Sequence, residues 1–319
     1  MSVRILILGG EGEEDGVLKR RAGEFLLWGL RQKGVAWEVC NPAESSIPQL
    51  QAYDVILCWS YIVHHSPVFL ESALNIEKMA RQLGIPVING VKNAAANHSF
   101  FMQTWHEHGL QCARCQNFDD FEELALDYPL ILRRDGVHRG QDVFLVNNPV
   151  EAQRLIDARK KDKAQANLDL AIEYIDTRGA DGYYRKYRSY VVGDRILPRH
   201  VFFSRHWLVN YEHLVANSDS VEANRMLVEG GEESALEVLK AARLTGSEIV
   251  ALDYSKDADG RCVFWEANRH FFMIGDKGST NTKLLEAATG QNDEQRRQSD
   301  EELGRAMAEL VLERIHNSQ

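Results

Sequence analysis

The chain has 319 residues, of which 44% are hydrophobic and 26% are charged, the balance of an ordinary globular protein with two or three lobes. Its formal net charge of −10 argues against nucleic acid or a membrane surface as a general partner, because both are anionic. No apolar run approaches the length of a membrane span, and residues 3–8 are typical of a first buried strand rather than of a signal peptide. Five cysteines, an odd number, favour a reduced cytoplasmic protein over a disulfide framework.

Strands and helices alternate over the first ninety residues. The apolar run 3–8 ends in Gly9-Gly10, as a buried parallel strand does before its loop. Further strands are predicted at 36–40, 54–59 and 84–89, with helices around 22–33 and 69–83 between them. This alternation predicts an open α/β lobe.

The middle of the chain changes pattern. A helix is predicted over 97–108, followed by a strand-like segment and an acidic helix over 118–126. Two short strands, 128–134 and 143–146, are predicted to form a hairpin with a flexible tip, and a polar helix should begin at Asn148-Pro149 and end near 166.

The last third is expected to be α+β. A short strand is predicted at 171–175, and a hairpin of 188–192 with 195–198 should turn at Gly193-Asp194. A long helix over 222–244 is expected to be interrupted at Gly230-Gly231. Two strands, 249–254 and 262–265, precede a charged amphipathic helix over 293–315.

The strongest chemical signal lies on those two late strands. Glu266 and Asn268 are two residues apart, so on a strand they point to the same face, which Asp253 on the paired strand can share. Two carboxylates and an amide oxygen make an all-oxygen set of the kind that Mg²⁺ accepts while phosphate or water fills its other positions. Because the flanking residues are apolar, a metal site is favoured over a solvated acidic face.

The order of motifs along the chain resembles that of the ATP-grasp superfamily, near the glutathione synthetases and the ribosomal-protein glutamate ligases. After the α/β lobe the matching pieces are YPLILRRDGVHRGQDV at 128–143, EYID at 173–176, KYRSYVVGDR at 186–195, ALDY at 251–254 and WEAN at 265–268. The resemblance implies an N-terminal lobe at 1–92, a small lobe with a phosphate lid at 93–170, and a C-terminal lobe with the metal site at 171–319.

The resemblance also implies roles for individual residues. ATP phosphates would be held by Arg133, Lys186 and the lid glycine Gly140, and the strand containing Glu173, Tyr174 and Ile175 would line the adenine. For Glu173 a simple salt bridge is the alternative. Arg188 and Arg205 would meet the substrate carboxylate and the acyl phosphate, although an ion pair of Arg188 with Asp181 or Asp194 is nearly as well supported.

The implied activity is the ATP- and Mg²⁺-dependent (or Mn²⁺-dependent) joining of a carboxylate to an amine through an acyl phosphate. The substrates would be small molecules, amino acids or peptides, and a homodimer is the default oligomer. One departure matters: lysine is usual in the family where this chain has Arg133. Arginine also binds phosphate, but the change keeps open a nucleotide-binding regulatory protein as the alternative.

A dinucleotide oxidoreductase based on Gly9, Gly10 and Gly12 is disfavoured. The G-x-G-x-x-G pattern is incomplete, because Asp15 stands where its last glycine would be. The acidic residues at 11 and 13–15 would also repel a pyrophosphate.

Overall fold

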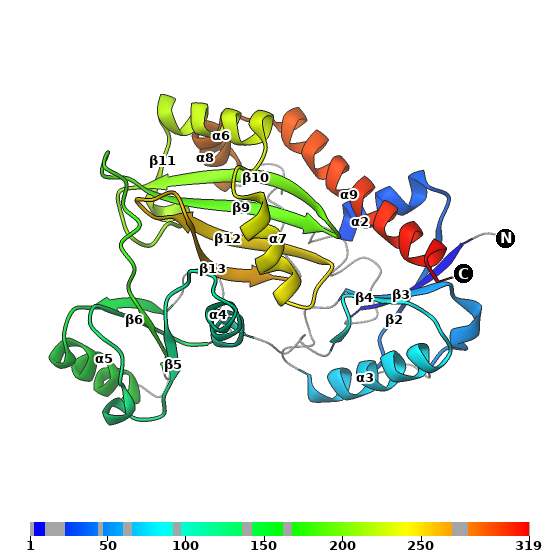
Figure 1. Ribbon diagram of the computed structural model, residues 1–319, viewed down its shortest axis with the longest axis horizontal. Helices are drawn as coiled ribbons and strands as arrows, with labels where there is room; N and C mark the ends of the chain where they lie inside the picture. Colours follow the sequence, from blue (N-terminus) through cyan, green and yellow to red (C-terminus); the bar gives the residue numbers. More distant parts are fainter. Residues whose placement is uncertain are drawn as a thin grey trace.

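The computed structural model describes residues 3–9, 23–43, 47–59, 66–91, 97–135, 142–161, 168–269 and 280–318. The described residues form three β-sheets, which lie in separate regions of the molecule (Figure 1). A five-stranded sheet occupies the centre, a four-stranded parallel sheet lies at the N-terminal end, and a four-stranded antiparallel sheet lies below the central one.

The N-terminal sheet is parallel, with strand order β2-β1-β3-β4. Its elements are β1 (Arg4–Leu8), α2 (Gly23–Gln32), β2 (Ala36–Cys40), β3 (Val55–Cys58), α3 (Pro67–Gln82) and β4 (Val87–Ile88). The strands β1 and β3 are buried on both faces, which explains their continuous apolar sequences. Ser66 begins α3 by accepting a hydrogen bond from the Phe69 backbone N–H at 3.2 Å. The predicted open α/β lobe is confirmed.

The small sheet is antiparallel, with strand order β5-β8-β6-β7. Its elements are β5 (Cys115–Asn117), β6 (Leu130–Arg133), β7 (Val143–Val146), α5 (Pro149–Lys161) and β8 (Leu170–Glu173), and α4 (His98–Glu107) precedes them. The hairpin of β6 and β7 is confirmed. The expected boundary between the second and third lobes, at 170, falls inside β8, and the lobe limits remain a prediction.

The acidic helix predicted over 118–126 is wrong. The structure has only a 3₁₀ turn there, η4 (Phe121–Glu123). The Gln116 side chain donates to the Glu123 carbonyl at 2.5 Å and accepts from the Ala125 N–H at 3.0 Å. These bonds occupy backbone groups that a longer helix would need for its own hydrogen bonds.

The central sheet is antiparallel, with strand order β11-β10-β9-β12-β13. Its strands are β9 (Tyr184–Val192), β10 (Arg195–Ser204), β11 (Leu214–Val215), β12 (Ile249–Lys256) and β13 (Cys262–Asn268). The turn between β9 and β10 is at Gly193-Asp194 as predicted, with Gly193 at a φ of 59°. The helices described in this region are α6 (Ser218–Gly230), α7 (Ala235–Leu244), α8 (Thr280–Thr289) and α9 (Asp293–His316). The predicted helix break is confirmed, because α6 ends at Gly230 and the next residue, Gly231, has a φ of 80°.

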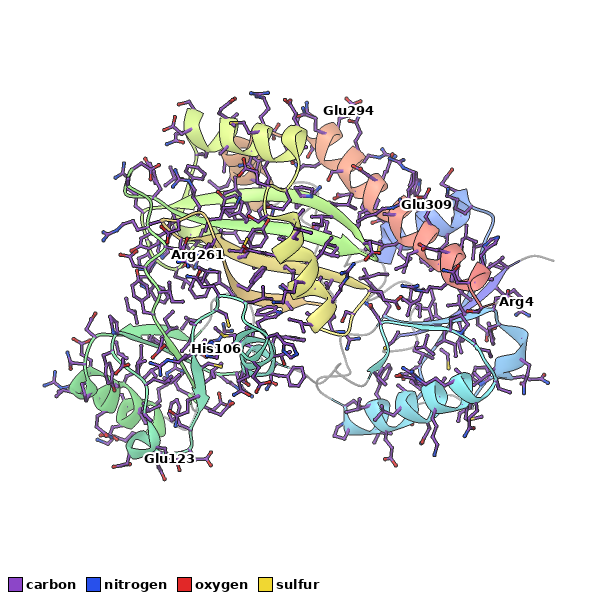
Figure 2. All side chains as sticks on the ribbon, viewed as in Figure 1. Arg4, His106, Glu123, Arg261, Glu294 and Glu309 are labelled. Atoms are coloured by element: carbon purple, nitrogen blue, oxygen red, sulfur yellow. The ribbon has the colours of Figure 1, made fainter. Side chains whose placement is uncertain are left out.

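The last helix, α9, packs back against α2 of the N-terminal lobe (Figure 1). One continuous apolar core joins β1 and β3 of that lobe, Tyr190 and Val192 of the central sheet, and the inner face of α9. Glu309, labelled in Figure 2, pairs with Lys33 at 2.9 Å and with Arg195 at 2.5 Å, one partner from each side. The C-terminal helix thus fastens the N-terminal lobe to the central sheet. In the described residues, no helix is long and apolar enough to cross a membrane.

The contact between α2 and α9 leaves no room for a side chain at its closest point. A Cβ added to Gly304 would lie 2.2 Å from the Phe25 carbonyl oxygen, so we expect Gly304→Ala to lower the free energy of unfolding by about 1–3 kcal/mol. Thermal and denaturant unfolding measure this change. Gly230→Ala is the matched control, because a Cβ there meets nothing within 4 Å. Equal stability of the two variants would contradict the proposed close contact.

Candidate active site between the small lobe and the central sheet

The register of the central sheet places the three predicted metal ligands on one face. Asp253 lies directly opposite Glu266 on one side and Arg188 on the other, and directly opposed residues of antiparallel strands point to the same face. Asn268, two residues after Glu266, shares that face. An irregularity in the pairing follows Asp253, because Tyr254 pairs with Phe264 and leaves Trp265 as the extra residue.

Asp253 is paired with Arg188 through two hydrogen bonds. The guanidinium Nε and Nη2 donate to the two carboxylate oxygens at 2.6 and 2.7 Å, and Asp253 is only 2% exposed. Burial alone would lower the pKa of Arg188, but the adjacent carboxylate of Asp253 outweighs it and raises that pKa above its ordinary value. Lys186 Nζ lies 3.9 Å from the same carboxylate. The two cations and Asp253 therefore form one charged group.

The ion pair that the sequence suggested for Arg188 has a different partner. Asp181 is bound by Arg185, and Asp194 is bound by Arg243 at 2.9 Å. Arg188 bonds to Asp253 instead, because β9 and β12 are neighbours in register, a pairing between residues 65 positions apart.

The small lobe adds Arg133 to this face. Arg133 is the last residue of β6 and is half-buried. Burial lowers its pKa, and the nearby carboxylates of Glu266, Asp135 and Asp169 oppose that shift. Arg133 thus lies within electrostatic reach of Glu266, a predicted metal ligand on another sheet.

His98 and Asp135 are site residues that the sequence analysis missed. His98 begins α4, its side chain is 3% exposed, and its Nε2 lies 3.1 Å from Glu266 Oε1. Its Nδ1 lies 3.7 Å from Asp135 Oδ1. Burial and Arg133 act to lower the pKa of His98, but the two carboxylates prevail and raise it. His98 belongs to no spacing motif, and Asp135 lies in the 128–143 segment but was assigned no role there, so only the tertiary contact brings the two together.

The residues expected to line the adenine lie together where β8 ends. Glu173 forms a salt bridge with Arg114, whose Nε donates to it at 2.8 Å. This is the contact that the sequence offered as the alternative to a role beside the adenine. The Tyr174 hydroxyl lies 2.9 Å from that of Tyr184. Ile175 is a partly buried member of an apolar cluster. Gly140 lies outside the described residues.

The structure does not bring Arg205 to this group. Arg205 is exposed, donates to the Tyr183 hydroxyl at 3.0 Å and lies over its ring. Tyr183 packs on Phe203 and belongs to the cluster that faces α6, on the opposite side of the sheet from Arg188.

The donor set at Asp253, Glu266 and Asn268 fits a hard divalent cation chemically, since all three offer oxygen atoms on one face. Within the described part of the chain no three His, Cys, Asp or Glu residues form a metal-binding cluster, so the set depends on the Asn268 amide. Asn268 Nδ2 is buried without a hydrogen-bond partner among the described residues, and Asp253 would have to share its oxygens between Arg188 and the cation.

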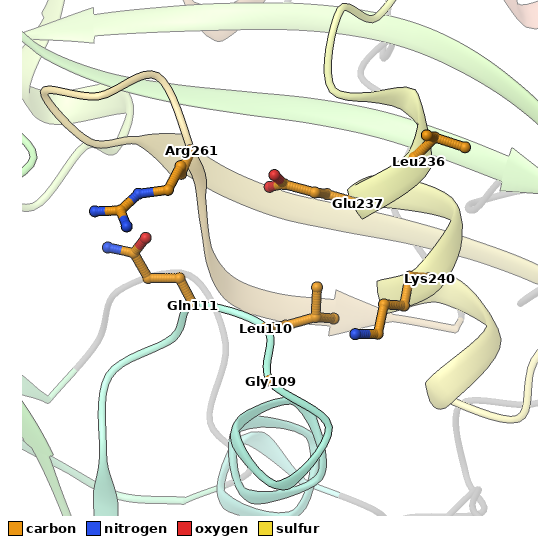
Figure 3. Close-up of a pocket in the computed structure, with 7 residues that line it drawn as sticks. All are labelled: Gly109, Leu110, Gln111, Leu236, Glu237, Lys240 and Arg261. Atoms are coloured by element: carbon orange, nitrogen blue, oxygen red, sulfur yellow. The ribbon is translucent and has the colours of Figure 1, made fainter.

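The far side of the central sheet carries a separate surface pocket of about 350 Å³ (Figure 3). It lies between α7 and residues 109–111, and Glu237, Lys240 and Arg261 line it. These cations are engaged, because Lys240 donates to the His108 carbonyl and Arg261 to Asp257. None of the predicted site residues lines this pocket.

Comparison with known proteins defines the fold. The solved structure of the ATP-grasp ligase PsnB complexed with minimal precursor matches 97% of this chain and 100% of its own, with a TM-score of 0.56 and 15% sequence identity. The chain has the ATP-grasp fold. The resemblance suggested by the order of motifs is therefore confirmed at the level of the fold. No sequence-family profile matches the chain. No curated protein is similar to it in sequence.

The face of the central sheet that carries Asp253 and Arg188 also carries a buried ion pair between Arg199 and Asp300. This pair predicts how the stability of the protein depends on pH. Arg199 Nη2 lies 2.8 Å from Asp300 Oδ1 on α9, and burial, against Arg199 and Arg296, raises the pKa of Asp300 to about 6. Because the folded carboxyl binds its proton more tightly than the unfolded one, Asp300 contributes least stability above about pH 6 and more as the pH falls.

We therefore expect the stability of the protein relative to its Asp300→Asn variant to increase by about 1 kcal/mol between pH 7 and pH 5. Denaturant unfolding of both proteins across that interval measures the difference. A difference that does not change with pH would show that Asp300 titrates normally in the folded state.

Proposed function

We propose that the protein is an ATP-dependent carboxylate–amine ligase that acts through an acyl phosphate. The observation that supports this most is the gathering of three cations, Arg133, Lys186 and Arg188, around the carboxylates of Asp253 and Glu266 between two sheets. Such a group suits a ligand that brings both negative phosphates and a divalent cation.

The chemistry proceeds in two displacements. A carboxylate oxygen of the first substrate forms a bond to the γ-phosphorus of ATP while the bond from that phosphorus to the β–γ bridging oxygen breaks, and ADP leaves. The amine nitrogen of the second substrate then bonds to the acyl carbon, inorganic phosphate leaves, and the nitrogen loses a proton. Both steps depend on positioning and on charge neutralisation rather than on a protein nucleophile.

The chain's own residues would divide this work. Arg133 and Lys186 would hold the phosphates, and Arg188 would stabilise the charge that develops on the acyl phosphate. Asp253, Glu266 and Asn268 would hold Mg²⁺, which supplies charge neutralisation on phosphate oxygens when bound. Because Arg188 now bonds to both oxygens of Asp253, nucleotide binding would draw Arg188 towards the phosphates and leave Asp253 available.

An amino acid or a peptide is the substrate class that we propose. PsnB, which shares the fold, was solved with a minimal precursor bound. Because the formal net charge of the chain is −10, an anionic ligand would be attracted by the local group of cations and not by the protein surface as a whole.

Glu266→Gln tests the metal site. The substitution keeps the size of the side chain but removes the charge, so we expect Mg²⁺-dependent ADP release in the presence of pooled amino acids or peptides to fall by about 100-fold or more. Glu294→Gln is the control, because Glu294 is an exposed glutamate near the start of α9 (Figure 2). Full activity of Glu266→Gln would refute the assignment.

Arg133 tests the phosphate site and the regulatory alternative together. Arg133→Ala should weaken ATP binding about 10- to 100-fold through loss of a charge-assisted contact, whereas Arg133→Lys should retain most of it. Titration calorimetry with ATP measures both, and Arg134→Ala, at the exposed neighbouring arginine, is the control. Tight nucleotide binding by the unmodified protein, with no turnover of any carboxylate in a broad panel, would favour a regulatory protein.

A further inference from the structure

His98 joins the small lobe to β13, the strand that carries two of the three predicted metal ligands. It is the first residue of α4, yet its Nε2 lies 3.1 Å from Glu266 Oε1 on β13. The imidazole side chain is 3% exposed and the Glu266 side chain 22%. A contact this close and this well buried restricts the rotation of the Glu266 carboxylate.

Asp135 faces the other edge of the ring. Its Oδ1 lies 3.7 Å from His98 Nδ1, and its Oδ2 accepts from Ser99 Oγ at 2.5 Å and from Asn117 Nδ2 at 3.3 Å. The Asp135 backbone N–H donates to Asp169 Oδ1 at 2.6 Å. Asp135 is therefore held by α4, β5 and the segment before β8, with its carboxylate beside the imidazole.

Glu266 meets His98 through Oε1 and shares its face of the sheet with Asp253 and Asn268. The contact therefore bears directly on how this carboxylate is turned towards that face. Residues that orient the ligating carboxylates and imidazoles of metal sites typically change metal affinity 10- to 100-fold when removed.

We propose that His98, held by Asp135, is a positioning residue that orients the Glu266 carboxylate for a divalent cation carried with a nucleotide. The inference rests on the proposed function. It adds a link from the small lobe, where Arg133 is expected to hold phosphate, to the metal ligands of the central sheet. Cation binding and nucleotide phosphate binding are thereby coupled through one buried imidazole.

The test measures Mn²⁺ binding directly, in the presence of an ATP analogue that cannot be hydrolysed. His98→Leu fills the space but offers no polar atom to Glu266, so Mn²⁺ affinity should fall about 10- to 100-fold. His98→Gln keeps a side-chain N–H near the position of Nε2, so its affinity should stay within a few-fold of the unmodified protein. His106→Leu, at an exposed histidine of the same helix, is the matched control (Figure 2).

A purely structural role for His98 makes a different prediction. In that case His98→Leu would lower the melting temperature and leave Mn²⁺ affinity unchanged in the folded protein, which overturns the inference. If His98→Leu does not fold, Asp135→Asn decides, since it removes the charge facing the ring. A several-fold weaker Mn²⁺ affinity supports the inference, and an unchanged affinity overturns it.

The outcome separates this inference from the proposed function. If the unmodified protein binds no Mn²⁺ with the nucleotide analogue, or Glu266→Gln binds it normally, the metal site itself is wrong. If Glu266→Gln loses Mn²⁺ while His98→Leu retains it, the metal site stands and only the positioning role of His98 fails.

Discussion

The stability of the central sheet depends on the neutralisation of the Asp253 charge. This carboxylate is only 2% exposed and belongs to a strand inside the five-stranded sheet. A buried charge without a partner would destabilise the fold severely, and Arg188 on the adjacent strand supplies both hydrogen bonds that it needs. The same pairing gathers Lys186 and Glu266 around Asp253, because all are close to it in the register. The requirement for charge balance therefore concentrates the candidate chemistry on one face.

That face is enclosed by elements from the whole length of the chain. The small lobe contributes Arg133 and His98, and α9 contributes Asp300, which lies against Arg199. The packing of α9 on α2 holds the N-terminal lobe against the same sheet, with two glycines at the closest point. Stability and site geometry are thus linked, because the helix that fastens the lobes also carries a buried partner of a site-face arginine.

The ion pair between Arg188 and Asp253 also relates the described structure to the proposed reaction. An arginine that neutralises a carboxylate can exchange that partner for a phosphate oxygen at little electrostatic cost, provided that a cation replaces it at the carboxylate. On this proposal the nucleotide and its divalent cation enter together. The contact of His98 with Glu266 would make the small lobe part of the same exchange.

Sequence by itself determined the parallel N-terminal lobe, the β9–β10 and β12–β13 pairs and the common face of Glu266 and Asn268, because strand periodicity is a local property. It failed at 118–126, where the side chain of Gln116 replaces helical hydrogen bonds, a competition that no periodicity reveals. Only the tertiary structure decided that Arg188 pairs with Asp253 rather than with a nearby aspartate, that Arg205 lies on the other side of the sheet, and that His98 reaches Glu266. Each of these depends on which strands and helices become neighbours, and that choice is made by the burial of whole faces.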